Sequence, residues 1–166
     1  MDEKFINMYN ILSDAILECD SKCISLSGGL DSSILAYLLQ KKNISAVCII
    51  SKESPGNDLT FSQMIAKKFS IPIKIKIVDI DELLFAVNET IKILKVFNDI
   101  EIRNAVVMYL SLQTVKKNVM VLHGAWHIAA GVTVVIVNCL VPHPDHPVQK
   151  ITRSLSLGLE LRRLIN

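Results

Sequence analysis

The chain has 166 residues, of which 51% are hydrophobic and 20% charged, and its formal net charge is +2 at neutral pH. This length predicts one domain with its own core, without room for a second catalytic domain, and the apolar fraction excludes a disordered protein. The small charge, with no basic cluster along the sequence, argues against a nucleic-acid-binding or membrane-surface protein.

The first part of the chain alternates between helical and strand patterns. Apolar residues recur at helical spacing over 5–18, and a short apolar run at 23–26 precedes two glycines. A helix is expected to start near Asp31 and Ser32. This helix ends at lysines 41 and 42. The same order then repeats, with a buried strand at 46–50, a polar turn at 53–58, a helix at 59–69 and a third strand at 73–78.

Two more helices and a fourth strand follow. The pattern predicts helices over 80–97 and 100–117, separated by a break at Asn98 and Asp99, and then a strand at 119–122. Helices that alternate with β-branched strands are typical of a parallel sheet covered on both faces. We therefore expect an α/β fold, a three-layer Rossmann-like domain with a mainly parallel sheet, which binds ligands at the carboxyl ends of its strands.

The segment Ser27-Gly-Gly-Leu-Asp-Ser-Ser33, called the glycine loop below, lies where the chain leaves the first strand. Glycines let the backbone turn sharply and present N–H groups to an anion, and the following helix directs its unpaired N–H groups into the same space. Hydroxyl donors come from Ser27, Ser32 and Ser33. The loop therefore predicts a pyrophosphate-binding nest, against the simpler alternative of a strand-to-helix turn with a serine cap.

Asp31 in this loop needs a separate explanation, because its negative charge repels phosphate unless a cation intervenes. It either caps the helix or binds a phosphate-bound magnesium ion. The loop also lacks the Gly-Lys-Ser/Thr of a Walker loop. Hydrolysis of ATP to inorganic phosphate is therefore not the chemistry we expect.

The string from Leu26 to Ser33 resembles the PP-loop of N-type ATP pyrophosphatases, in the adenine nucleotide alpha hydrolase-like superfamily, and is most similar to that of asparagine synthetases. Segments 54–59, 65–69 and 102–110 resemble the synthetase domain in the same order. The resemblance covers residues 5–124. It implies that ATP and Mg²⁺ are bound, that ATP is cleaved between its α- and β-phosphates, and that a carboxylate such as aspartate is adenylated and converted to an amide by ammonia.

The resemblance also implies roles for individual residues. Arg103 could offer a planar fork to a carboxylate or a phosphate, or it could pair with Asp99 or Glu101 on its own helix. The remaining assignments are pyrophosphate contacts from Ser27, Gly28, Gly29, Asp31 and Ser32, with Asp31 at the metal, and an adenosine site lined by Leu26, Ile50 and Ser51.

Two features depart from the family pattern. Asparagine synthetases usually carry an N-terminal glutaminase domain, whereas this chain reaches its glycine loop within thirty residues. Ammonia would then be free or come from a separate glutaminase partner. The family's fourth strand ends in an acidic Gly-x-Gly-x-Asp-Glu signature, and the matching segment 122–131 keeps Gly124, a candidate cofactor contact, but not the acids.

The composition changes beyond the fourth strand. Residues 1–118 contain thirteen lysines and one arginine, whereas residues 119–166 contain one lysine, three arginines and all four histidines. We therefore divide the chain into an ATP pyrophosphatase domain, residues 1–124, and an atypical segment, residues 125–166, of different origin by frameshift, fusion or decay. In the case of a frameshift, the gene would carry the acidic Gly-x-Gly-x-Asp-Glu stretch in another reading frame.

Within the atypical segment we expect a buried strand at 132–137 and a modest terminal helix at 155–164. The apolar stretch that starts at Val119 reaches membrane-spanning length only by including two histidines, so a strand is the better interpretation. The histidines at 123 and 127 could share a helical face and form a metal site with those at 143 and 146, but neighbouring prolines oppose such a scaffold.

The four cysteines, at positions 19, 23, 48 and 139, have irregular spacings and form no Cys-x-x-Cys pair. Free buried cysteine behaves as a small apolar residue, and the start Met1-Asp2-Glu3-Lys4 is not that of a secretory leader. These features predict a cytoplasmic protein. The other enzyme alternative is a PP-loop enzyme that modifies tRNA or nucleobases, but those that transfer sulfur or bind zinc generally need paired cysteines, and the sequence also lacks a basic RNA-binding cluster. A catalytically impaired nucleotide-binding module is the other alternative to an amide-forming ligase.

Overall fold

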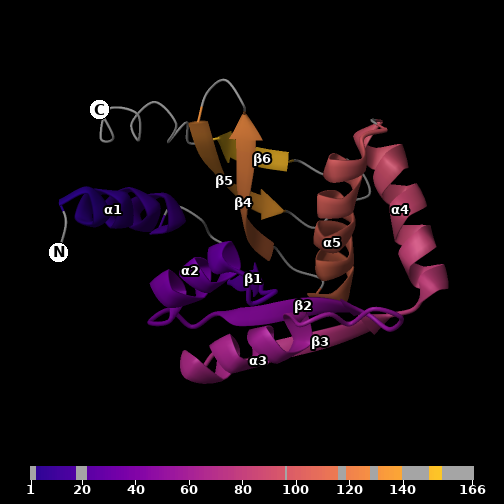
Figure 1. The fold of residues 1–166 in the computed structure, drawn as a ribbon, viewed down its shortest axis with the longest axis horizontal. Coiled ribbons are helices and arrows are strands. Elements are labelled where there is room, and N and C mark those ends of the chain that lie inside the picture. Colours follow the sequence, from indigo (N-terminus) through magenta and orange to yellow (C-terminus); the bar gives the residue numbers. More distant parts are fainter. Residues whose placement is uncertain are drawn as a thin grey trace.

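The computed structural model describes residues 3–17, 22–95, 97–115, 119–127, 131–139 and 150–154. Helices and strands alternate through most of these residues (Figure 1). In chain order they are α1 (Glu3–Leu17), β1 (Cys23–Ser25), α2 (Leu30–Leu39), β2 (Ser45–Ser51), α3 (Asp58–Lys68), β3 (Ile73–Val78), α4 (Ile80–Leu94), α5 (Asp99–Val115), β4 (Val119–His127), β5 (Gly131–Cys139) and β6 (Lys150–Ser154).

The described strands form a six-stranded sheet in the order β3-β2-β1-β4-β5-β6. The strands β1 to β4 pair in parallel, whereas β5 and β6 are added in antiparallel orientation. The strand order reverses at β1, which has β2 on one side and β4 on the other. The loop after β1 therefore lies at the switch point where open α/β sheets bind their ligands.

Helices cover both faces of the parallel strands. On one face α1, α2 and α3 pack against Ile24 and Ala46, and on the other α5 packs against Cys23 and Val47. A further cluster, around Val78, joins α4 to α5. Adjacent residues of one strand belong to different clusters because successive side chains point to opposite faces of a sheet. The predicted α/β fold, with three layers and a mainly parallel sheet, is confirmed.

Several element ends differ from the prediction. The helix α4 ends at Leu94 rather than at residue 97, because Lys95 adopts a left-handed conformation with φ of 55° and its N–H bonds the carbonyl of Ile91. The strand β4 continues to His127, past the predicted end at residue 122, because it pairs with β5 along its whole length. The strand β6 was not predicted.

The alternative in which two histidines share a helical face is wrong, because His123 and His127 both lie on strand β4. The other two histidines and the predicted helix at 155–164 lie outside the described residues. In the parts of the chain that the structure describes, no helix is long and apolar enough to cross a membrane. The apolar stretch that starts at Val119 contributes β4 and β5 instead.

Candidate functional site

The glycine loop joins β1 to α2 at the carboxyl end of the parallel strands. Leu26, at the end of β1, is completely buried, and its N–H donates to the carbonyl of Val47 on β2 at 2.9 Å. Ser27 and Gly29 are exposed, as are Leu30 and Asp31 in the first turn of α2. The loop is thus fixed to the sheet where it begins and open to solvent where it meets the helix.

Ser32 holds the loop together from inside. Its side chain is largely buried, and its hydroxyl donates to the carbonyl of Gly29 at 3.1 Å. The same oxygen accepts from the N–H of Gly28 at 3.2 Å and lies 3.3 Å from the hydroxyl oxygen of Ser27. The Ser27 oxygen in turn accepts from the N–H of Gly29 at 3.3 Å. The backbone N–H group of each glycine therefore donates a hydrogen bond to a serine hydroxyl oxygen.

Gly28 is the point at which the loop touches α3. Its φ is +83°, a left-handed conformation that side chains rarely adopt. A Cβ at this position would lie 2.4 Å from the Cβ of Phe61, 2.6 Å from its carbonyl carbon and 2.7 Å from the nitrogen of Ser62. Both the conformation and the space therefore require glycine here. At Gly29 the nearest atom to such a Cβ would be the Ser27 hydroxyl oxygen at 3.4 Å, an ordinary contact.

The amino end of α2 is open to an anion. Gly29 is the N-cap residue and provides no side-chain hydrogen bond, and the first helical bond runs from Ser33 N–H to the Gly29 carbonyl at 3.0 Å. The N–H groups of the first turn have no partner within the helix, and the dipole adds partial positive charge there. Asp31 lies in this first turn and not at the cap, so its predicted capping role is wrong.

The carboxyl end of β2 lies beside the loop, because β2 neighbours β1 in the sheet. Ile50 is buried, and the partly exposed Ser51 donates its hydroxyl to a carboxylate oxygen of Glu53 at 3.2 Å. These two residues were predicted to line an adenosine site. The structure places them on the neighbouring strand at the same edge of the sheet as the loop, and their role stays a prediction.

Cys48 lies on the same strand, against the start of α3. Burial raises the pKa of its thiol and the negative charge of Asp58 raises it further, whereas a hydrogen bond with Ser62 acts in the opposite direction. The thiol is therefore protonated near neutral pH and weakly nucleophilic. Cys48 packs as an apolar residue, in agreement with the interpretation of the cysteines as small core side chains.

Arg103 and Gly124 lie on other elements. The Arg103 guanidinium pairs with the carboxylate of Asp99, one turn earlier on α5, at 3.5 Å, and both side chains are exposed. This is the second of the two interpretations that the sequence left open for the arginine. Gly124 lies on β4, four residues beyond Met120, which is in register with Ile24 of β1. It is therefore on the strand next to the loop, beyond the end of β1.

Sequence reasoning missed the contribution of α3. The backbone at Phe61 and Ser62 packs directly against Gly28, and Asp58 begins the same helix. The polar segment 54–59 before this helix was one of the pieces that resemble a synthetase domain. This resemblance indicated that the region belongs to the site. The contact between Gly28 and α3 could not be predicted from it, because that contact arises from the tertiary structure.

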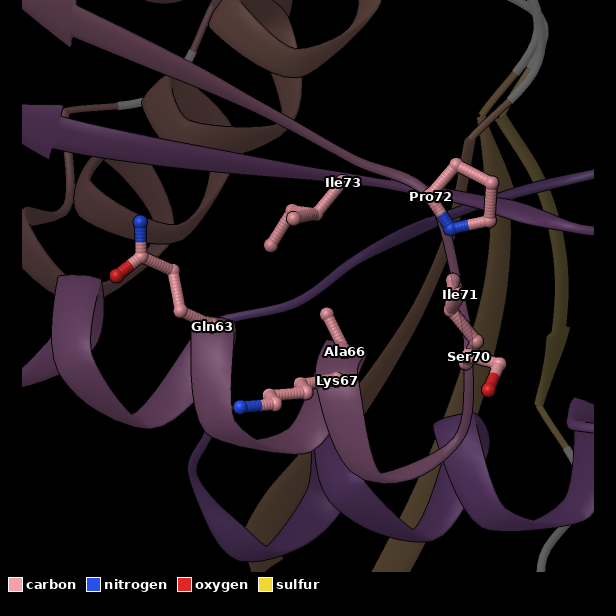
Figure 2. A pocket seen from close by; sticks show the side chains of 7 residues that line it. All are labelled: Gln63, Ala66, Lys67, Ser70, Ile71, Pro72 and Ile73. Carbon is pink, nitrogen blue, oxygen red and sulfur yellow. The ribbon is translucent and has the colours of Figure 1, made fainter.

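A pocket with a volume of about 550 Å³ lies between the end of α3 and the start of β3 (Figure 2). It is at the amino ends of the parallel strands, whereas the glycine loop is at their carboxyl ends. It contains none of the predicted site residues. Its lining residues are Gln63, Ala66, Lys67, Ser70, Ile71, Pro72 and Ile73.

The sheet order and the glycine loop after β1 are those of an α/β domain of the PP-loop class. Residues 20–125, more than half of the chain, match the sequence model of the family described as asparagine synthase. The chain belongs to this family. Members of this family are ATP-using enzymes. A search of curated proteins found no match to the chain.

Two synthetases are among the solved structures to which this chain is similar. The NH3-dependent NAD synthetase from Campylobacter jejuni, in complex with the nitrate ion, is 22% identical with a TM-score of 0.45, and the match covers 73% of this chain and 56% of that one. The NMN synthetase from Francisella tularensis is 20% identical with a TM-score of 0.42, covering 68% and 50%. This chain therefore spans about half the length of these two proteins.

Proposed function

We propose that this chain binds ATP with Mg²⁺ through the glycine loop and is the nucleotide-binding part of an asparagine-synthetase-like ligase. The ligase would adenylate a carboxylate, with aspartate as the first candidate, release pyrophosphate and form an amide with ammonia. The observation that carries the proposal is the seating of Gly28 against the α3 backbone beside an uncapped helix α2. This arrangement keeps backbone donors together at the switch point of the sheet.

The donors in the loop fit a pyrophosphate group. The N–H groups of Gly28 and Gly29 donate to serine oxygens over 3.2 and 3.3 Å, which are long distances for such bonds. Charged phosphate oxygens form shorter and stronger bonds, so they can replace the two hydroxyls. The hydroxyls of Ser27 and Ser32 can then rotate to donate to the phosphate as well, in the case of Ser32 by giving up its bond to the Gly29 carbonyl. The unpaired N–H groups in the first turn of α2 add to the same site.

Asp31 is the residue of this chain that would hold Mg²⁺. It is exposed in the first turn of α2, at the end of the helix toward which the loop donors converge. Among the described residues no group of three or more His, Cys, Asp or Glu side chains could hold a metal ion. A magnesium ion bound to phosphates needs only one or two carboxylates, because substrate oxygens and water complete its shell. Mg²⁺ would neutralise phosphate charge during the reaction.

In the reaction, a carboxylate oxygen of the acceptor attacks the α-phosphorus of ATP, and the bond from this phosphorus to the bridging β-oxygen breaks. The glycine loop holds the pyrophosphate that leaves. Ammonia, either free or delivered by a separate glutaminase, then displaces AMP from the acyl carbon. Electrostatic stabilisation of the leaving group is the contribution we assign to the loop, because its backbone N–H donors would bind the pyrophosphate oxygens as their negative charge develops.

A second candidate is a nucleotide-binding module without turnover. The observation that favours it is the absence of acids from the 122–131 segment, where the family carries its acidic signature. The salt bridge of Arg103 within α5, rather than with a group of the loop, points in the same direction.

Pyrophosphate release from ATP separates the two candidates. The full chain is incubated with ATP, Mg²⁺, ammonium and aspartate, and then with other carboxylates in place of aspartate. Pyrophosphate that appears in step with AMP and an amide product supports the ligase. ATP binding that is measurable by calorimetry, together with no pyrophosphate from any acceptor, supports the module and eliminates ligase turnover by this chain.

A further inference from the structure

Helix α3 packs on the rest of the domain through small side chains. Its buried residues are Ser62 and Ala66, which lie one turn apart on the same face of the helix. Ser62 is completely buried, and Ala66 is almost so. Neither side chain is long enough to hold the helix away from its neighbours, so the backbone of α3 can approach them closely along this face.

Such a close approach occurs where α3 passes Gly28. A Cβ on this glycine would lie 2.6 Å from the carbonyl carbon of Phe61 and 2.7 Å from the nitrogen of Ser62. These two atoms form the peptide bond between Phe61 and Ser62. A residue without a side chain on the loop therefore meets the backbone of the helix beside a residue with a small side chain.

Cys48 on β2 lies against Ser62 from the side of the sheet. The Cys48 side chain is buried, and its thiol forms a hydrogen bond with Ser62. The Ser62 side chain is thus enclosed by the strand, while its peptide group contacts Gly28. Protein interiors are close-packed, so a larger side chain at position 62 needs α3 to move away from β2.

The size of Ser62 matters more to this packing than its hydroxyl. The hydroxyl donates to the carbonyl of Leu59, one turn earlier on the same helix, at 3.1 Å. This bond satisfies the buried hydroxyl within α3 and joins the helix to no other element. The bond with Cys48 is weak, because a thiol is a weak donor.

The donors of the glycine loop depend on the position of Gly28. Its N–H donates to the Ser32 hydroxyl oxygen at 3.2 Å, and the N–H of Gly29 donates to that of Ser27 at 3.3 Å. Both distances are at the long end of the range for N–H···O bonds, so a small displacement of Gly28 is enough to break them. The two N–H groups would then lose the orientation that the loop gives them.

We propose that Ser62 is a positioning residue for the glycine loop: its small side chain seats α3 against Gly28 and so fixes the backbone donors of the loop. The ligand of these donors, pyrophosphate, rests on the proposed function, whereas the seating itself does not. A larger residue at position 62 moves α3 outward and removes the support of Gly28. Ser62 acts through Gly28 and makes no contact with the ligand.

Titration of folded variants of the full chain with pyrophosphate and Mg²⁺ tests the proposal. Ser62→Val enlarges the side chain and is expected to weaken binding at least about fivefold, as the loss of one hydrogen bond would. Ser62→Ala keeps the size and is expected to bind as the unaltered chain does. Ala86→Val is the control for crowding, because Ala86 is also completely buried but lies on α4, in the cluster around Val78. Its affinity is expected to stay unchanged.

A second substitution distinguishes positioning from a general loss of stability. Cys48→Ala removes the sulfur against which residue 62 packs and leaves space for a larger side chain there. Combined with Ser62→Val, it is expected to restore part of the lost pyrophosphate affinity. In a protein that is merely destabilised, a cavity beneath α3 would lower stability further and restore nothing. If Ser62→Val does not fold, Ser62→Thr takes its place with one added methyl group.

Amide hydrogen exchange gives a readout without any ligand. The N–H of Gly28 is expected to exchange faster in Ser62→Val than in the unaltered chain, Ser62→Ala or Ala86→Val. Equal exchange at Gly28 in these proteins, or unchanged pyrophosphate affinity in folded Ser62→Val, overturns the positioning role. If the unaltered chain binds no pyrophosphate, the proposed function fails instead, and the exchange of Gly28 alone then decides whether Ser62 positions the loop.

Discussion

Gly28 and Phe61 are in direct backbone contact: a Cβ on the glycine would lie 2.4 Å from the Cβ of the phenylalanine and 2.6 Å from its carbonyl carbon. The loop after β1 and the helix after β2 therefore hold each other in place. A change that separates them moves the loop donors even when it leaves those donors chemically intact. The phosphate site thus depends on residues that never contact the ligand.

Gly28→Ala is expected to lower the free energy of unfolding through two effects. The left-handed backbone costs about 1–2 kcal/mol with a side chain present, and the clash with α3 adds about 1–3 kcal/mol. Chemical denaturation measures the sum. Gly56→Ala is the matched control, because Gly56 also has a positive φ, +56°, but nothing lies within 4 Å of its added Cβ. Equal losses in the two variants would contradict the contact between loop and helix.

Ser32→Ala is expected to cost about 1 kcal/mol of stability and to weaken pyrophosphate binding, because the hydroxyl bonds both Gly28 and Gly29. Ser54→Ala is the control for stability, since Ser54 is exposed and lies outside the helices and strands. Denaturation and a pyrophosphate titration are run on both variants. Unchanged curves for Ser32→Ala would contradict the organising role given to this serine.

Thr90→Val is expected to stabilise the protein by about 1 kcal/mol, because the buried Thr90 hydroxyl has no hydrogen-bond partner among the described residues and valine has the same shape. Ser62→Ala provides the contrast. Its hydroxyl is also buried but donates to the Leu59 carbonyl at 3.1 Å, so its loss is expected to cost about 1 kcal/mol. Thermal unfolding gives both values. A Thr90→Val protein that melts below the unaltered chain would show that this hydroxyl is satisfied after all.

Cys48 makes stability depend on alkaline pH. Its folded-state pKa is raised above the ordinary value of 9.0, so the unfolded chain releases this proton first. The contribution of the thiol to stability is complete below that value and is lost as the pH rises through the folded-state pKa. Cys48→Ala is therefore expected to lose less stability than the unaltered chain above about pH 9. Urea unfolding above about pH 9 measures how the free energy of unfolding of each protein changes with pH. The same pH dependence in both proteins would contradict the raised pKa of Cys48.

Much of the fold was predictable because its signals are local. Apolar residues at helical spacing and the glycine pair after a short apolar run predicted α1, β1 and α2 in the correct order. The ends of α4 and β4 were not predictable in this way. Lys95 terminates α4 in a left-handed conformation without a glycine, and β4 is lengthened by its pairing with β5, which lies farther along the chain.

The glycine loop was predictable from its residues, but its setting was not. The contact of Gly28 with Phe61 and the bond from Lys74 to Thr114 join residues that are 33 and 40 positions apart. No local pattern specifies such contacts, since they arise from the packing of helices on the sheet. The division of the chain into residues 1–124 and 125–166 stays a prediction, as do the individual roles of Asp31, Arg103 and Gly124.

Titration of the full chain with ATP and Mg²⁺, compared with its Gly29→Ala variant, tests the central claim most directly. Gly29 has an ordinary φ of −67° and space for a methyl group, so the variant is expected to fold as the unaltered chain does. The added Cβ would lie 3.4 Å from the Ser27 hydroxyl oxygen, which we propose that phosphate oxygens displace. We predict saturable binding that pyrophosphate competes away and that weakens at least about tenfold, or about 1.4 kcal/mol, in Gly29→Ala. Equal ATP affinity in the two folded proteins would contradict the assignment of the glycine loop as the phosphate site.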